Sequence, residues 1–113
     1  MENAGVKQFL SILGTARDFM PVDIPIRRLS VLLWLAENGS ATLDEIVAGV
    51  GGGSSAVYGD LGALSRIDHD GGKGLRYVRT LKDGPSNCRL RYALTSPGET
   101  VAFMIATATP AAE

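Results

Sequence analysis

The segment 42–64, TLDEIVAGVGGGSSAVYGDLGAL, most constrains the fold, because it predicts two short helices joined by a glycine-rich corner. Thr42 and Glu45 form a T-x-x-E capping box immediately before an apolar run, which is typical of a helix start. The three glycines at 51–53 end that helix, since glycine loses the most backbone entropy on ordering. Ser54 or Ser55 is then expected to cap the second helix.

The second helix of this segment has one apolar face and one small or polar face. Val57, Leu61 and Leu64 follow helical spacing and predict a buried side. The opposite side is predicted to lie against another molecule, and it carries Ser55, Tyr58, Gly59 and Gly62. Two helices in this arrangement predict a helix-turn-helix whose second helix reads DNA.

Composition is that of a small globular protein of one domain, residues 1–113, with a net charge of −1. The single cysteine, Cys88, excludes an internal disulfide and fits a reducing compartment. There is no apolar run as long as a membrane span, and the first residues lack the layout of a signal peptide. We therefore expect a cytoplasmic protein that does not engage a membrane.

Positive charge is concentrated in one part of the chain. Residues 1–72 carry five basic and nine acidic side chains, whereas residues 73–91 carry six basic side chains and one acidic side chain. The basic stretch contains two strand-like runs, 75–82 and 88–95, around a turn of Asp, Gly, Pro, Ser and Asn. In the second run Leu90, Tyr92 and Leu94 alternate with Arg89 and Arg91, which predicts a β-hairpin with an apolar and a basic face.

Three further helices are expected. The first spans about 4–19, with an apolar stripe along it that requires a partner. The second starts near Pro25. Its buried face is expected to consist of Ile26, Leu29, Leu32, Leu33 and Ala36, and its solvent face of Arg27, Arg28 and Glu37. Trp34 is expected to be half-buried against the reading helix. The last helix starts with Ser96 as its cap and Pro97 at its first position.

The order of these elements resembles a winged-helix transcription regulator. The segment SSAVYGDLGAL resembles the reading helix of MarR- and PadR-type regulators, and RLRYALTSPGE resembles the end of their second wing strand. The resemblance implies an α+β winged helix-turn-helix with an N-terminal helix at 4–20, a core at 24–95 that includes the wing at 75–95, and a C-terminal helix at 96–108. It also implies a transcription regulator that binds double-stranded DNA as a homodimer.

Candidate site residues follow from the need for cations at phosphates and for narrow side chains in a groove. The predicted DNA-binding residues are Ser54, Ser55, Tyr58, Arg66, Lys73, Arg76, Arg79, Lys82, Arg89 and Arg91. The predicted dimer interface consists of Phe9, Leu10, Leu13, Val101, Met104 and Ile105.

Other classes of function are less well supported. The single histidine, His69, lies in a D-H-D triplet without a second ligand at metal-binding spacing, so we expect no metal, no cofactor and no enzymatic activity. Nothing in the sequence specifies a small-molecule sensor pocket. The alternative is a winged-helix adaptor or inhibitor that binds a protein partner instead of DNA. Phage-encoded proteins belong to this class.

Overall fold

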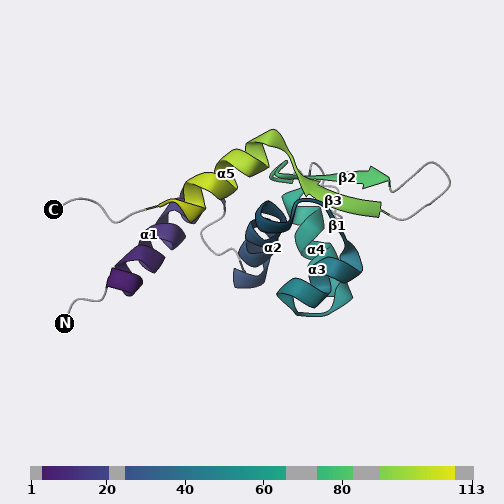
Figure 1. The fold of residues 1–113 in the computed structure, drawn as a ribbon, viewed down its shortest axis with the longest axis horizontal. Coiled ribbons are helices and arrows are strands. Elements are labelled where there is room, and N and C mark those ends of the chain that lie inside the picture. Colours follow the sequence, from purple (N-terminus) through teal and green to yellow (C-terminus); the bar gives the residue numbers. More distant parts are fainter. Residues whose placement is uncertain (1–3, 21–24, 66–73, 83–89, 109–113) are drawn as a thin grey trace.

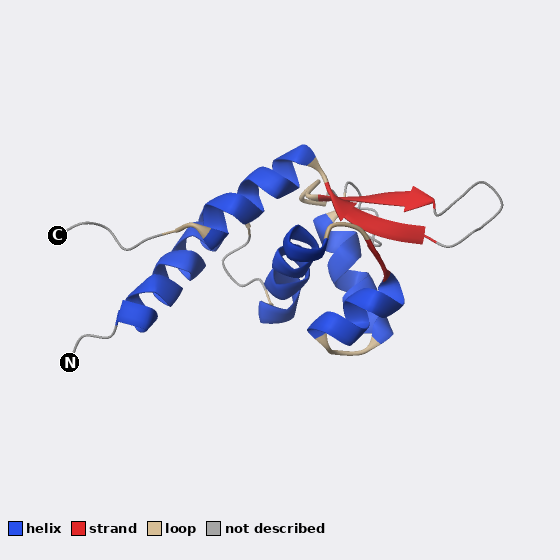
Figure 2. Cartoon of the chain, viewed as in Figure 1, coloured by secondary structure: helices blue, strands red, loops and turns tan. Residues whose placement is uncertain are grey.

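The computed structural model describes residues 4–20, 25–65, 74–82 and 90–108. Within these residues the chain forms five helices and one small antiparallel sheet, which confirms the predicted α+β class (Figure 1, Figure 2). In chain order the elements are α1 (Ala4–Phe19), α2 (Ile26–Asn38), β1 (Ala41–Thr42), α3 (Leu43–Val50), α4 (Ser54–Leu64), β2 (Val78–Lys82), β3 (Leu90–Leu94) and α5 (Ser96–Ala106).

The sheet has the strand order β1-β3-β2, so the short β1 pairs with β3, on the edge opposite β2. Ala41 lies opposite Tyr92, and Val78 lies opposite Leu94. All four side chains are buried, so the side of the sheet that carries them packs against the helices. Leu90 falls on the same side by alternation but is exposed, because it lies beyond the edge of the core.

Helix ends follow the sequence signals closely. Thr42 and Glu45 form the predicted capping box in full at the start of α3. Gly39 ends α2 with a positive φ, as the Asn-Gly pair predicts. Two caps differ from expectation: Thr95, not Ser96, accepts the Gly98 amide at the start of α5, and α4 begins after Gly53 without a side-chain cap.

The core is centred on α2. Its buried side chains are Leu29, Val31, Leu32 and Leu35, whereas Ile26 and Ala36, which the sequence assigned to the buried face, are exposed. Trp34 is half-buried as predicted, and its indole lies against Gly49 of α3. A Cβ at Gly49 would stand 2.1 Å from the Trp34 Nε1 atom, so glycine is required for this close approach.

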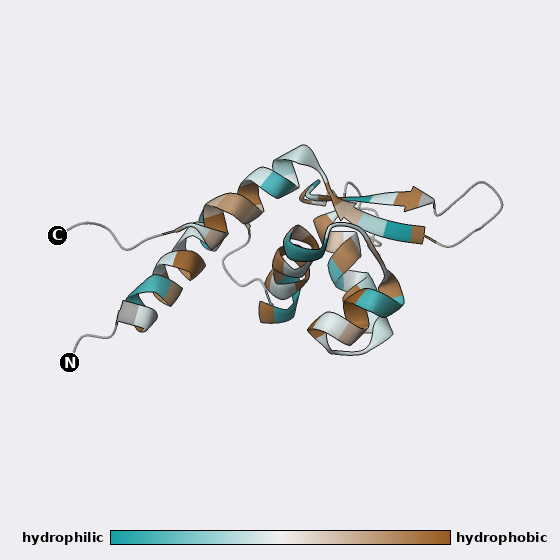
Figure 3. Cartoon of the chain, in the orientation of Figure 1, coloured by the Kyte–Doolittle hydropathy of each residue, from teal (hydrophilic) through white to brown (hydrophobic). Residues whose placement is uncertain are grey.

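Helices α1 and α5 form an arm that projects from the rest of the molecule (Figure 1). The Gln8 side chain donates to the carbonyl of Ala108, which places the start of α1 beside the end of α5. The Tyr77 hydroxyl donates to the carbonyl of Phe19 at 2.9 Å and attaches the other end of α1 to the strand lead-in. Burial raises the pKa of Tyr77. Figure 3 shows apolar segments along both helices of the arm.

The capping box gives a test of the fold. Thr42→Val keeps the shape of the side chain but removes the hydroxyl that accepts the Glu45 amide. We expect the free energy of unfolding to fall by about 1 kcal/mol in urea titration. Thr80→Val, the same change at an exposed position of β2, should stay within about 0.5 kcal/mol of the parent. Equal effects in the two variants would show that the box does not stabilise α3.

Candidate nucleic-acid interface

Helix α4 presents a narrow, uncharged surface. Ser54, Ser55 and Tyr58 are exposed, as predicted, and the Tyr58 side chain is 48% exposed. A Cβ at Gly59 would meet no atom within 4 Å, so the surface is open there as well. Gly62 is buried, against expectation, so the exposed strip covers only the first half of the helix. Small and polar side chains of this kind are suited to a groove.

The only charged residue of α4 is buried beneath that surface. Asp60 is 0% exposed and pairs with two arginines at the start of α2. The Arg27 Nε atom lies 2.5 Å from Asp60 Oδ2, and the Arg28 Nε atom lies 3.1 Å from Oδ1. A second nitrogen of Arg27, Nη2, donates to Oδ1 at 3.4 Å. Arg27 and Arg28, predicted to stand in solvent, are only partly exposed, because the carboxylate of α4 binds both.

The C-terminal end of α4 is fixed by the segment that leads into β2. The backbone amides of Leu75, Arg76 and Tyr77 donate to the carbonyls of Ala63, Ser65 and Leu64, at 2.7–3.0 Å. These bonds satisfy carbonyl groups that a helix end leaves without partners. Arg76 adopts φ of 66°, a left-handed conformation that is strained for a non-glycine residue, at the centre of this connection. Thus α4 is held along its buried side and at its end.

The corner between α3 and α4 uses the glycines as predicted. Gly51 and Gly52 have φ of 91° and 83°, which other residues rarely adopt. A Cβ at Gly52 would also stand 2.9 Å from the Cδ atom of Arg27. The arginine pair of α2 therefore lies beside the corner where α4 begins.

The predicted cations of the hairpin have different environments. Arg91 donates to Ser40 Oγ at 3.2 Å and to the Ser40 carbonyl at 2.9 Å, and it lies 3.5 Å from Glu45. The side chain was expected to stand free for a polyanion, but it ties β3 to the start of α3. Arg76 and Arg79 are exposed. Lys82 is the last residue of β2, and Arg66, Lys73 and Arg89 lie outside the described residues, as do Cys88 and His69.

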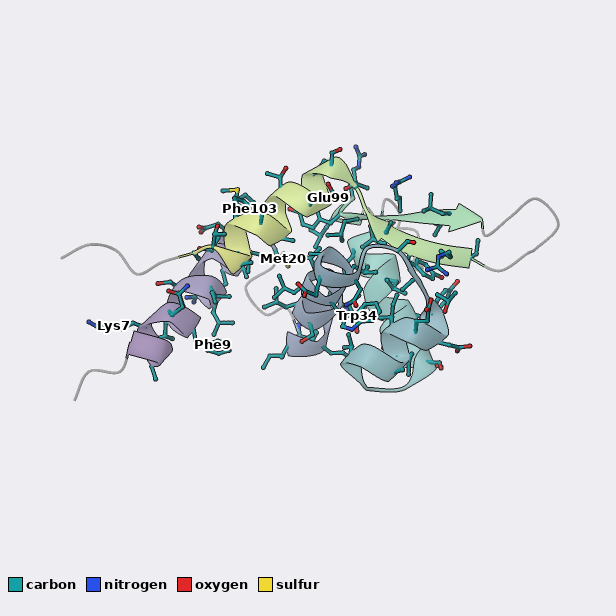
Figure 4. The ribbon with its side chains drawn as sticks, viewed as in Figure 1. Lys7, Phe9, Met20, Trp34, Glu99 and Phe103 are labelled. Carbon is teal, nitrogen blue, oxygen red and sulfur yellow. The ribbon has the colours of Figure 1, made fainter. Side chains whose placement is uncertain are left out.

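The six predicted dimer residues divide into two groups. Phe9, Leu10 and Met104 are exposed on the arm, with Phe9 58% exposed. Leu13 packs partly on the core, and Val101 and Ile105 are buried within the chain itself. Phe103, which is not among the predicted interface residues, is also exposed. Phe9 and Phe103 extend from different sides of the arm (Figure 4).

A groove of about 910 Å³ lies between the end of α2, the outer side of the β2–β3 pair and α5. Its walls are mostly apolar, with Leu33, Leu81 and Phe103 among them, and Arg79, Glu37 and Glu99 add charge. Within the described residues no set of three His, Cys, Asp or Glu side chains is placed to hold a metal ion. None of the described helices has the length and apolar character needed to cross a bilayer.

Comparison of the chain with protein-family models, with curated proteins and with solved structures gave no match.

The buried ionic group predicts a selective loss of stability. Asp60→Ala leaves two partly buried guanidinium groups without their carboxylate. We expect the free energy of unfolding to fall by about 2–3 kcal/mol, less than for a fully buried pair because the arginines keep some contact with water. The matched variant Asp44→Ala, at an exposed position of α3, should cost under about 1 kcal/mol. Similar losses for the two aspartates would contradict a structural role for Asp60.

Proposed function

We propose that the chain is a winged helix-turn-helix protein that binds double-stranded DNA through α4 and acts as a transcription regulator. The observation that carries the proposal is the order α2–β1–α3–α4–β2–β3 together with the strand order β1-β3-β2. This arrangement puts an antiparallel strand pair beside a helix-turn-helix, as in a winged helix. It also leaves the first half of α4 open at the surface.

The chemistry of α4 supports groove entry. Its first turn begins without a side-chain cap, so its free amides and the hydroxyls of Ser54 and Ser55 can donate to phosphate or base edges. Burial, and after it the charge of Tyr58, raises the pKa of the Tyr92 phenol. Arg76, just before β2, and Arg79, within β2, add exposed cations.

The arm supports a dimer as the binding unit. Val6, Phe9 and Leu10 of α1 and Phe103 and Met104 of α5 are large apolar side chains exposed to solvent. Val6, Phe9 and Leu10 share one face of α1, and a contiguous exposed apolar face is typical of an interaction surface. Two-fold symmetry would then present two copies of α4 to successive major grooves.

DNA binding through α4 is tested by Ser55→Glu. The new carboxylate lies in the first turn of α4, where the helix dipole tolerates it, but it would repel phosphates. We expect the affinity for a random-sequence duplex, measured by fluorescence anisotropy in low salt, to fall by about tenfold or more. Ser96→Glu makes the same change in the first turn of α5 and should leave the affinity unchanged. Equal affinities of the two variants would exclude α4 as the contact.

The dimer is tested by charging the arm. Phe9→Asp with Leu10→Asp places two carboxylates on the exposed apolar surface of α1. We expect sedimentation velocity to change from a dimer to a monomer, with the far-ultraviolet circular dichroism preserved. Lys7→Asp, on the same helix at a half-buried polar position, serves as the control. A monomeric parent protein would refute this part of the proposal.

Protein binding is the second candidate, and the environment of Arg91 favours it. A wing that uses its central arginine to hold β1 and α3 has one cation fewer for phosphate. The two candidates differ in salt dependence, because duplex affinity that depends on phosphate contacts falls steeply as salt rises. Failure of the parent protein to bind any duplex at low salt would support the adaptor.

A further inference from the structure

We propose that Arg27, Arg28 and Asp60 form a preorganised site for a backbone phosphate of duplex DNA, on the side of α4 away from the sheet. The inference rests on the proposed DNA-binding function and assigns that function a second anchoring point.

The charge of the group is unbalanced. Two guanidinium groups share one carboxylate, so the group carries a net charge of +1. The carboxylate is fully enclosed, but the side chains of Arg27 and Arg28 are 38% and 27% exposed. Arg28 uses only its Nε atom on Asp60, so both of its Nη groups retain donors for another anion. One phosphodiester would neutralise the group.

The position of the group complements the hairpin. Successive residues of a helix are separated by about 100°, so Asp60 projects about 200° around α4 from Tyr58. Because Asp60 binds Arg27 and Arg28, both arginines lie across α4 from Tyr58. A helix in a major groove has a phosphate backbone on each side. Arg76 lies on the strand side, at the C-terminal end of α4, and Arg27 and Arg28 lie on the side of α2.

The helical unit has no other source of positive charge. In residues 25–65 the sequence contains two basic side chains, Arg27 and Arg28, and four acidic ones. If α4 approaches DNA, this pair must supply the attraction on its flank. The shared carboxylate also holds both guanidinium groups in place, so less rotamer entropy is lost when a phosphate binds.

The experiment compares duplex binding of the parent protein with that of Arg28→Gln. This change removes the surplus charge but leaves Asp60 paired with Arg27 at 2.5 Å, so the fold should persist. We expect the affinity for random-sequence duplex to fall about fivefold to tenfold near physiological salt. The slope of log affinity against log salt should decrease by about one per chain. Arg28→Lys should restore most of the slope, because it restores the charge.

Arg17→Gln is the matched control, since it removes the same charge from an exposed position on α1. It should change neither the affinity nor the slope. A parent protein that binds duplex with the same affinity and slope as Arg28→Gln would overturn this inference and leave the proposed function standing. A parent protein that binds no duplex would overturn both.

A second measurement needs no variant and therefore does not depend on the stability of Arg28→Gln. Phenylglyoxal modifies exposed guanidinium groups, and peptide mass spectrometry locates the modified residues. In the parent protein, saturating duplex should protect Arg28 from modification and leave Arg17 reactive. Equal modification of Arg28 with and without duplex would overturn the proposal.

Discussion

The ion pairs of Asp60 with Arg27 and Arg28 determine how α4 is presented. A carboxylate in the interior is costly unless it is paired and hydrogen-bonded, and three donors at 2.5–3.4 Å meet that requirement. Because the donors come from the first turn of α2, the pairing fixes the rotation of α4 about its own axis. That rotation leaves Ser55 and Tyr58 outward and buries Val57 and Leu61. An apolar contact alone would be less directional.

The other constraints on α4 act at its ends. The amides of 75–77 bind its last carbonyls, and the left-handed conformation of Arg76 turns the chain from the helix into β2. At its start, Gly51 and Gly52 permit a corner that brings α3 and Arg27 together. Arg91 fixes the position of the sheet, because it connects β3 to Ser40 and Glu45. Charged groups thus hold the strands and α4 at defined positions on an apolar core.

Local signals in the sequence predicted much of this fold. Thr42 with Glu45, and Asn38 with Gly39, act through backbone groups a few residues away, and both pairs function as expected. Signals that depend on distant neighbours were less informative. The spacing of α2 could not show that Asp60, more than thirty residues away, would bind Arg27 and Arg28. Alternation in β3 likewise predicted which side Arg91 occupies, but not that Ser40 and Glu45 would reach it.

The same distinction applies to the candidate site. Exposure of Ser55 and Tyr58 follows from helical spacing within one segment, so the sequence sufficed to identify it. Whether a basic side chain is available to bind phosphate depends instead on the groups around it in the fold. Arg91, chosen for its basic strand, is occupied by oxygen acceptors, whereas Arg28, dismissed as surface, keeps free donors within a net positive group. The net positive charge near α4 therefore depends on how many guanidinium groups share each carboxylate, which only the folded arrangement defines.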